Sequence, residues 1–285
     1  MTENQDLIGF VYKSRISDAE NLANKIVEVF KLDRKSWIST VDDIENITNK
    51  FKSTSFIVVL GGDGTILKTA QVVAPFSIPI VGVNMGRVGF MTELKVDEVL
   101  DRLPIYMDGS VRIEERMMIK ASVLPSVKNT EPSIFHALND IVIGRPAGSG
   151  LVDVNMYVND SSLANYRADA VVFATATGST GYSLSTGGSI IYPDARVVTV
   201  QPVAPHTGLR QGLIFSEDTK IELYADCYPS ASLHVDGSFG VSVESDAKVL
   251  ITPSPYVTRF LRSDTSNEFY TDLMNRLELI YRLKT

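Results

Sequence analysis

Residues 56–74 read FIVVLGGDGTILKTAQVVA, and this stretch decides the fold class. Phe56–Leu60 is a continuous run of aliphatic and aromatic residues, which is typical of a central parallel strand covered on both faces. Three glycines then surround Asp63, and a helix is predicted over Thr65–Ala74. In α/β sheets, ligands bind at the carboxyl ends of strands, where glycines allow close approach and the next helix N-terminus favours anions. The stretch therefore predicts an α/β sheet with a phosphate-binding loop at Gly61–Thr65.

The residues around this stretch repeat the alternation of strand and helix. Leu7–Tyr12 is apolar enough for a buried strand, and a helical segment follows it. The apolar residues on one face of that segment are Leu22, Ile26, Val29 and Phe30. Ile78–Val83 is predicted to be a third strand, and Val96–Leu103 one more helix, stopped by Pro104. Residues 1–105 are therefore expected to form an α/β domain with a parallel sheet.

After about residue 110 the pattern changes to short strand-like runs separated by Gly, Pro, Asn and Asp. The clearest runs are Met117–Leu124, Asp140–Ile143, Val152–Val158, Ala170–Ala174, Lys220–Ala225 and Val241–Ile251. Residues 106–265 are therefore expected to form a mostly β domain. Near the C-terminus, apolar residues recur at helical spacing at Phe269, Leu273, Leu277 and Ile280. This spacing predicts a helix over residues 266–285 that packs back on the first domain.

Charge and composition exclude several classes of protein. The formal net charge is −7 and the sequence has no basic run, so nucleic acid is not an expected partner. The single cysteine, Cys227, excludes an intramolecular disulfide and a zinc site built from cysteines. No signal-peptide pattern occurs, and no apolar run approaches the ~20 residues that a membrane span needs. A cytoplasmic protein with no membrane partner is expected.

The glycine loop Gly61–Thr65 (GGDGT) matches neither G-x-x-x-x-G-K-[ST] nor G-x-G-x-x-G. Its simplest explanation is a tight strand-to-helix turn in which Asp63 or Thr65 caps the helix. Three glycines around one carboxylate exceed what such a turn requires, which favours contact with a ligand.

Several separated motifs, taken together, resemble those of the NAD kinase family. The motifs are GGDGT after a strand, Asn139-Asp140, Thr175–Ser185 (TATGSTGYSLS) with Gly187-Gly188, Gly86–Phe90 (GRVGF), Ala204-Pro205-His206 and Val235-Asp236-Gly237. They follow the family's order over most of the chain. Ala176 and Gly181 stand where the family usually has proline and alanine, and Arg87 lies in a loop that often reads G-x-L-G-F. The resemblance implies transfer of a terminal phosphoryl group from a nucleoside triphosphate to the adenosine ribose 2′-hydroxyl of NAD.

The resemblance also implies roles for individual residues. Asp63 matches the family's essential acid. Asn139 is expected at the adenine and Asp140 at ribose hydroxyls, while Phe90 lines the adenine pocket and Asp169 lies near the nicotinamide end. The residues expected to bind NAD or ATP are Gly61, Gly62, Gly64, Thr65, Phe90, Asn139, Asp140, Arg167, Asp169, Thr177, Thr180, Gly181, Tyr182 and Ser185.

The expected chemistry fits these residue types. A ribose hydroxyl is a weak nucleophile, and phosphoryl transfer depends on in-line positioning and on neutralising charge over the moving group. Asp63 is expected to orient or deprotonate the 2′-hydroxyl as the catalytic residue. Mg²⁺ is expected as the divalent metal, arriving with the triphosphate rather than held by protein ligands. Substrate is expected between the two domains.

Two other functions remain possible on the sequence alone. Diacylglycerol and sphingoid kinases also carry GGDGT, but they usually continue with Asn-Glu, whereas Ile66-Leu67-Lys68 follows here. A non-catalytic nucleotide sensor would have little need for both Asp63 and Asp140. The phosphate donor is ATP or inorganic polyphosphate, and the family resemblance implies a homodimer or homotetramer.

Overall fold

A computed structural model describes residues 7–14, 17–86, 89–126, 131–263 and 273–274 of the chain. These residues form two compact units. Unit 1 contains the described residues up to Glu115 and again from Val257, and unit 2 runs from Arg116 to Tyr256. Both divisions fall inside long strands, β6 (Arg112–Leu124) and β17 (Lys248–Arg262), so each of these strands begins in one unit and ends in the other.

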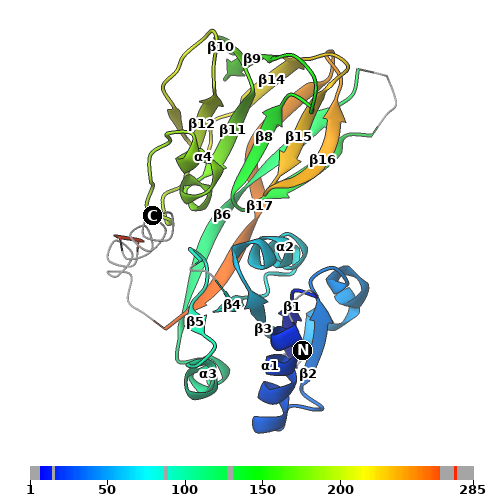
Figure 1. Cartoon of the computed structure of the whole chain (residues 1–285), viewed down its shortest axis with the longest axis vertical. Coiled ribbons are helices and arrows are strands. Elements are labelled where there is room, and N and C mark those ends of the chain that lie inside the picture. Colours follow the sequence, from blue (N-terminus) through cyan, green and yellow to red (C-terminus); the bar gives the residue numbers. More distant parts are fainter. Residues whose placement is uncertain (1–6, 15–16, 87–88, 127–130, 264–272, 275–285) are drawn as a thin grey trace. The chain divides into compact units, whose positions relative to one another are not determined.

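Unit 1 is built on a parallel sheet (Figure 1). The order across it is β2 (Ser36–Thr40), β1 (Leu7–Tyr12), β3 (Thr54–Gly61), β4 (Ile80–Asn84) and the end of β17, all parallel, and the short β5 (Leu94–Lys95) also pairs with β4. Phe260 of β17 lies opposite Ile80 of β4, and both are fully buried. Neighbouring strands in this sheet come from both ends of the chain.

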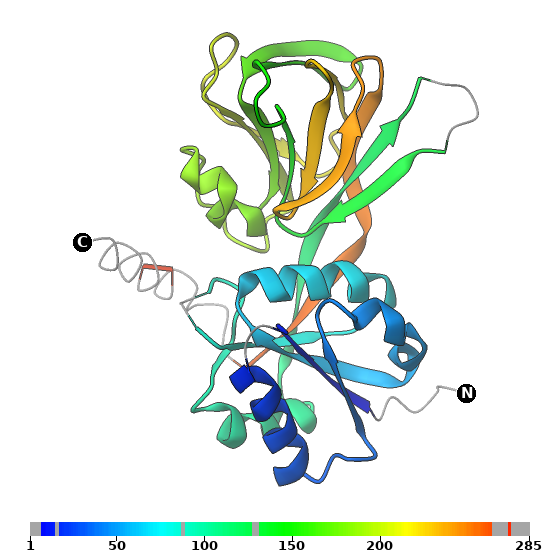
Figure 2. The same cartoon turned by 45° about the vertical axis from the view of Figure 1, so that its right-hand side comes forward.

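Helices cover both faces of the unit 1 sheet (Figure 2). On one face, α1 (Ser17–Val29) and α3 (Val99–Met107) share a core with alternate residues of β1, β3 and β4. On the other face lies α2 (Asp63–Val73), whose Ile66 packs directly over Gly82 of β4. Two 3-10 segments complete the unit, η1 (Ile44–Ser53) and η2 (Ala74–Phe76). The glycine loop thus joins the central strand to a helix that covers the sheet.

Three local predictions for unit 1 are wrong. Helix α2 begins at Asp63 rather than Thr65, because the N–H groups of Thr65 and Ile66 already bond to the Gly62 carbonyl. Pro104 lies inside α3, which continues to Met107, because burial of Tyr106 offsets the single N–H that proline lacks. Val29 is 51 % exposed, because the buried face of α1 runs through Ala19, Leu22, Ala23 and Ile26 instead.

Unit 2 is a pair of antiparallel sheets. One sheet has the order β10 (Ser161–Ala168), β9 (Val152–Val158), β14 (Ile221–Asp226) and β17, with β6 pairing β17 and β7 (Ser133–Ala137) pairing β6. The other has the order β13 (Leu213–Ser216), β12 (Val197–Val203), β11 (Ala170–Thr175), β8 (Asp140–Gly144), β15 (Ala231–Val235) and β16 (Ser238–Val243). Beyond β11 the chain forms η3 (Thr177–Thr180) and the single-turn α4 (Tyr182–Ser185).

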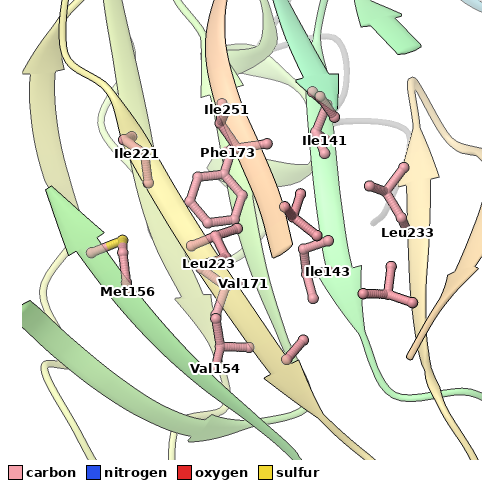
Figure 3. Packing of buried hydrophobic residues seen from close by; sticks show 14 of the residues in the cluster. Ile141, Ile143, Val154, Met156, Val171, Phe173, Ile221, Leu223, Leu233 and Ile251 are labelled. Carbon is pink, nitrogen blue, oxygen red and sulfur yellow. The ribbon is translucent and has the colours of Figure 1, made fainter. Parts of the chain in front are cut away.

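The core of unit 2 lies between its two sheets (Figure 3). Ile141, Phe173 and Leu233 come from the six-stranded sheet, and Met156 and Leu223 come from the other. Burying such side chains contributes roughly 1.5–3 kcal/mol each. Alternate residues of β8 and β11 pack in this core and anchor the two strands. These strands carry the predicted nucleoside-binding residues at their ends.

The predicted fold class is confirmed, since unit 1 is α/β with parallel strands and unit 2 is mostly β. The predicted single strand Val241–Ile251 is wrong: β16 and β17 belong to different sheets, separated by a turn in which the Ala247 N–H bonds to the Glu244 carbonyl. The predicted C-terminal helix lies outside the described residues, apart from Leu273 and Met274. Within the described part of the chain, every helix is too short or too polar to span a membrane.

Candidate active site

The glycine loop of unit 1 turns the chain from β3 into α2 within two residues. Strand β3 ends at Gly61, Gly62 is the helix N-cap, and Asp63 is the first helical residue. A Cβ at Gly61 would lie 2.4 Å from Thr65 Oγ1, so this glycine is needed for the turn itself. Gly62 and Gly64 have nothing within 4 Å of an added Cβ, and neither has a positive φ. The packing of the unit therefore does not explain glycine at these two positions.

The Asp63 carboxylate is fixed by the backbone of a neighbouring loop. The N–H of Phe90 donates to its Oδ2 at 2.8 Å, and the N–H of Met91 donates to its Oδ1 at 3.1 Å. A Cβ at Gly89 would lie 2.4 Å from Asp63 Oδ1, so only glycine fits beside the carboxylate. The GGDGT and GRVGF motifs therefore meet at one side chain, which is half-buried at the start of α2.

The Asn139-Asp140 pair of unit 2 is held from outside by Asp236. The Asp236 Oδ1 accepts the N–H groups of Asn139 and Asp140, at 2.7 and 3.0 Å, and its Oδ2 accepts the Leu138 N–H at 3.0 Å. The Asp236 N–H returns a bond to the Asp140 carbonyl at 2.9 Å. These four bonds fix the chain where it enters β8.

Each side chain of the pair has a buried polar group in an unfavourable environment. Asp140 is only 5 % exposed, and burial, with a smaller contribution from the Asp236 charge, raises its pKa to about 7. The buried Asn139 Oδ1 has no hydrogen-bond partner. Buried polar groups are normally satisfied, so an acceptor without a partner beside a carboxylate of raised pKa makes this pair a candidate for ligand binding.

The stretch after β11 packs against this pair. Thr175 Oγ1 bonds to the Leu138 carbonyl at 2.6 Å, and a Cβ at Gly178 would lie 2.1 Å from the Asn139 carbonyl oxygen. A Cβ at Gly181 would lie 3.5 Å from Asn139 Nδ2 and 3.7 Å from Asp140 Oδ2. Glycine at position 178 is therefore needed for the close approach to Asn139, and Gly181 lies beside the side chains of both members of the pair.

The hydroxyl groups of this stretch mostly bond within the protein. Thr180 Oγ1 donates to the Thr177 carbonyl at 3.2 Å, and the buried Arg116 donates to Thr177 Oγ1 at 3.3 Å. Ser185 Oγ lies 3.5 Å from the Gly181 carbonyl. Tyr182 is 42 % exposed, which leaves its ring available to a ligand.

Asp169 lies at the far end of the β8–β11 ladder, and Arg167 belongs to β10, a strand of the other sheet. Asp140 pairs with Ala174, whereas Ala170 pairs with Gly144, so Asp169 is separated from Asp140 by about 13–17 Å of strand. Arg167 lies 4.0 Å from Asp153, and Asp169 accepts a bond from Arg145 Nε at 2.6 Å. The structure does not bring these two residues together with Asn139 and Asp140.

Sequence reasoning missed Gly89, Met91, Gly178 and Asp236 as supports of the site. Gly89 and Asp236 stand in motifs that were recognised, but their roles depend on residues 26 and 96 or more positions away. Among the described residues, no group of three or more His, Cys, Asp or Glu side chains could hold a metal ion.

Comparison with known proteins agrees with this fold. Residues 8–111 match the family model described as the ATP-NAD kinase N-terminal domain, and residues 138–263 match the ATP-NAD kinase C-terminal domain. The NAD kinase of Dehalococcoides mccartyi strain CBDB1 is 32 % identical over 272 residues, 95 % of either chain. That of Thermoanaerobacter sp. strain X514 is 41 % identical over 224 residues, 78 % of either chain.

Two solved structures share the fold. Yeast NADH kinase, complexed with NADH, has a TM-score of 0.84 at 19 % identity and covers 95 % of this chain and 87 % of its own. An NAD kinase from Archaeoglobus fulgidus, in complex with ATP, has a TM-score of 0.75 at 23 % identity and covers 95 % and 98 %. The α/β unit with its glycine loop and the β-rich unit are thus the two halves of a two-domain kinase. The chain belongs to the NAD kinase family.

Proposed function

We propose that this chain transfers the terminal phosphoryl group of ATP to the 2′-hydroxyl of the adenosine ribose of NAD, giving NADP. The observation that carries the proposal is the Asp63 carboxylate, held by the N–H groups of Phe90 and Met91 at the start of α2. Family membership supports it, and neither family model supports a lipid kinase or a non-catalytic sensor. In this proposal Asp63 acts in phosphoryl transfer, and Asn139 and Asp140 bind NAD.

Asp63 acts on the attacking hydroxyl in this proposal. Its two hydrogen bonds fix the plane of the carboxylate, and each oxygen keeps a lone pair for the 2′-hydroxyl. The carboxylate orients that hydroxyl and accepts its proton as the 2′-oxygen bonds to the γ-phosphorus of ATP, while the bond from that phosphorus to the bridging oxygen breaks and ADP leaves. A positioned acid or base typically contributes 10²–10⁴-fold to the rate.

The glycine loop holds the phosphates. Gly62 and Gly64 leave open space beside the backbone, and the N–H groups of Asp63 and Gly64 come before the first helical hydrogen bonds, which Thr65 and Ile66 make to the Gly62 carbonyl. Phosphate oxygens satisfy such groups, and the helix dipole favours their charge. Thr65 is buried against Gly61, so its contribution to the loop is to fix the turn.

The residues of unit 2 recognise the nucleoside. Asn139 bonds to the adenine edge and Asp140 accepts ribose hydroxyls, while Thr177, Thr180, Gly181, Tyr182 and Ser185 surround them. The orphaned Asn139 Oδ1 and the raised pKa of Asp140 support this assignment, because a ligand would relieve both. By family resemblance, Asp169 lies near the nicotinamide end of NAD and Phe90 lines the adenine pocket, and Arg167 is a further binding residue.

Mg²⁺ is proposed to enter with the donor. Among the described residues, no group of side chains fits a metal site made by protein ligands alone. No step of the reaction is therefore assigned to a metal held only by the protein. Mg²⁺ commonly binds through substrate phosphates and water, with few protein ligands. Activity with inorganic polyphosphate in place of ATP, measured at equal phosphoryl concentration, decides the donor range.

Location and assembly are also proposals. The single cysteine supports a cytoplasmic location, and the family resemblance supports a homodimer or homotetramer. Cell fractionation with an antibody to the chain tests the first, and sedimentation velocity of the purified protein tests the second.

The test of the reaction is Asp63→Asn. The amide keeps the shape of the side chain but cannot take the proton, so we expect turnover of NAD to fall at least ~10²-fold while NAD affinity changes little. Asp108→Asn is the matched control, because Asp108 also accepts a backbone N–H, that of Ser110 at 2.8 Å, at an exposed position. Near-normal NADP formation by Asp63→Asn in a coupled assay would remove Asp63 from the mechanism.

A further inference from the structure

Asp236 lies in a hairpin turn whose geometry suits aspartate but does not account for the contacts of its carboxylate. It forms, with Gly237, the two-residue connection from β15 to β16, and both have positive φ, +47° and +78°. Asp-Gly is a favoured pair for such a hairpin turn. Turn geometry explains an aspartate here, but it does not explain where the carboxylate points.

The carboxylate points at the start of β8. It accepts three consecutive backbone N–H groups, those of Leu138, Asn139 and Asp140. Strand β8 lies beside β15 in the sheet, so this contact is made across the ladder at the position where pairing ends. Hydrogen bonds to an ionised acceptor are about twice as strong as neutral ones. The Asp236 side chain therefore sets the backbone from which Asn139 and Asp140 project.

We propose that Asp236 is a positioning residue for nucleoside recognition, holding the Asn139-Asp140 peptide in its binding geometry through three backbone hydrogen bonds. The inference rests on the proposed NAD kinase function and deepens it. Asp236 touches no substrate atom in this scheme, because its oxygens face the backbone of the segment that binds.

The same placement gives nucleoside binding a pH dependence. Asp140 is packed against β11 through Ala174, against the 178–181 stretch, and against the β15–β16 turn. Burial is the larger cause of the raised pKa of Asp140, which is about 7. Of the described groups in these elements, Asp236 supplies the charge that adds to this effect. The ionised carboxylate accepts ribose hydroxyls best, so NAD affinity falls as pH drops through this value. Without the Asp236 charge, NAD affinity should begin to fall at a lower pH. The pKa of Asp140 should still lie above the ordinary aspartate range, because burial remains.

The test uses Asp236→Ala and Asp236→Asn in the full chain. Alanine removes both acceptor oxygens and with them all three hydrogen bonds, whereas asparagine keeps one acceptor oxygen and loses the charge and the other acceptor. Asp160→Ala is the matched control, because Asp160 also has a positive φ, +65°, in a hairpin turn of unit 2, and its ion pair with Lys220, at 2.9 Å, is exposed. NAD dissociation constants are measured by calorimetry between about pH 5.5 and about pH 8.5, with kcat and KM for NAD and ATP at the upper end.

We expect Asp236→Ala to weaken NAD binding at least about tenfold, with a matching rise in the KM for NAD, while kcat at saturating NAD and the KM for ATP stay within about twofold. Asp236→Asn should recover part of that loss, and its NAD affinity should fall at a lower pH than in the unaltered protein. Asp160→Ala should resemble the unaltered protein in every measurement.

An Asp236→Asn protein with unaltered NAD affinity and an unaltered pH midpoint would overturn the inference, even if the alanine variant does not fold. So would a loss of kcat with no change in KM. Failure of the proposed function looks different, since the unaltered protein would then form no NADP at any pH.

Discussion

Gly89→Ala tests whether the position of the Asp63 carboxylate controls catalysis. The added Cβ would lie 2.4 Å from Asp63 Oδ1, against an ordinary contact of 3.4 Å or more, so about 1 Å of movement is required. The carboxylate is the end of a side chain, and it moves more easily than the backbone of Phe90 and Met91 that supplies its two N–H donors. A misplacement of about 1 Å can cost on the order of 10²-fold in rate, or about 2.7 kcal/mol in activation free energy.

The assay is steady-state formation of NADP, with urea unfolding alongside. We expect kcat to fall roughly 10²-fold, and the free energy of unfolding to fall by only about 1–2 kcal/mol, because two half-buried hydrogen bonds weaken. Gly150→Ala is the control, since Gly150 is exposed, has no positive φ and has nothing within 4 Å of an added Cβ. Combining Gly89→Ala with Asp63→Asn should cost no more than Asp63→Asn alone. Normal turnover in a folded Gly89→Ala protein, or full additivity in the double variant, refutes the reasoning.

Two further predictions concern the Asn139-Asp140 pair. Asn139→Ala and Asp140→Ala should each weaken NAD binding ten- to hundredfold and leave the dissociation constant of ATP nearly unchanged. Calorimetry with each ligand measures both constants. A selective loss of ATP binding would contradict the assignment of these two residues to NAD. Asp140→Asn should become more stable relative to the unaltered, ligand-free protein as pH rises, by on the order of 2 kcal/mol between pH 5 and pH 8. The reason is that the pKa of Asp140 is about 7 in the folded protein and lower in the unfolded chain. Between these two pKa values the unfolded chain is ionised and the folded protein is not, so the unaltered protein loses stability as pH rises toward 7. Urea unfolding at the two pH values checks the sign, and a constant difference between the proteins would show that Asp140 ionises in the folded state as it does when unfolded.

Local pattern was enough to predict the two-part architecture. The strand Phe56–Leu60 and the loop after it lie where predicted because a continuous apolar run followed by glycines has few other solutions. Pattern failed where tertiary packing decides. Pro104 is kept inside α3 by burial of its neighbours, and Val241–Ile251 is divided because its two halves join different sheets. The compact units divide within β6 and β17, and β17 continues through Pro253 and Pro255, residues that local pattern would interpret as the end of a strand.

The candidate site was predicted as a set of residues but not as an arrangement. Asp63, Asn139 and Asp140 could be named from their motifs, since each motif is short and contiguous. The supports of these side chains come from elsewhere, the Phe90 and Met91 N–H groups for Asp63 and the Asp236 carboxylate for Asn139 and Asp140. Contacts between positions so far apart along the chain leave no periodicity in the sequence. Only the folded chain reveals them.

The passage of β6 and β17 from one unit to the other has a consequence for biosynthesis. Unit 2 is one uninterrupted stretch, Arg116–Tyr256, so all of its strands can leave the ribosome and pair before synthesis reaches the rest of unit 1. Phe260 arrives after that stretch, yet it belongs beside Ile80 on β4, which was made about 180 residues earlier. At ordinary elongation rates of about 5–20 residues per second, β4 waits on the order of 10 seconds or longer for this neighbour. During translation the first-made half of the protein is therefore the last to be completed, and its exposed strand edge is where a nascent chain most needs protection from aggregation.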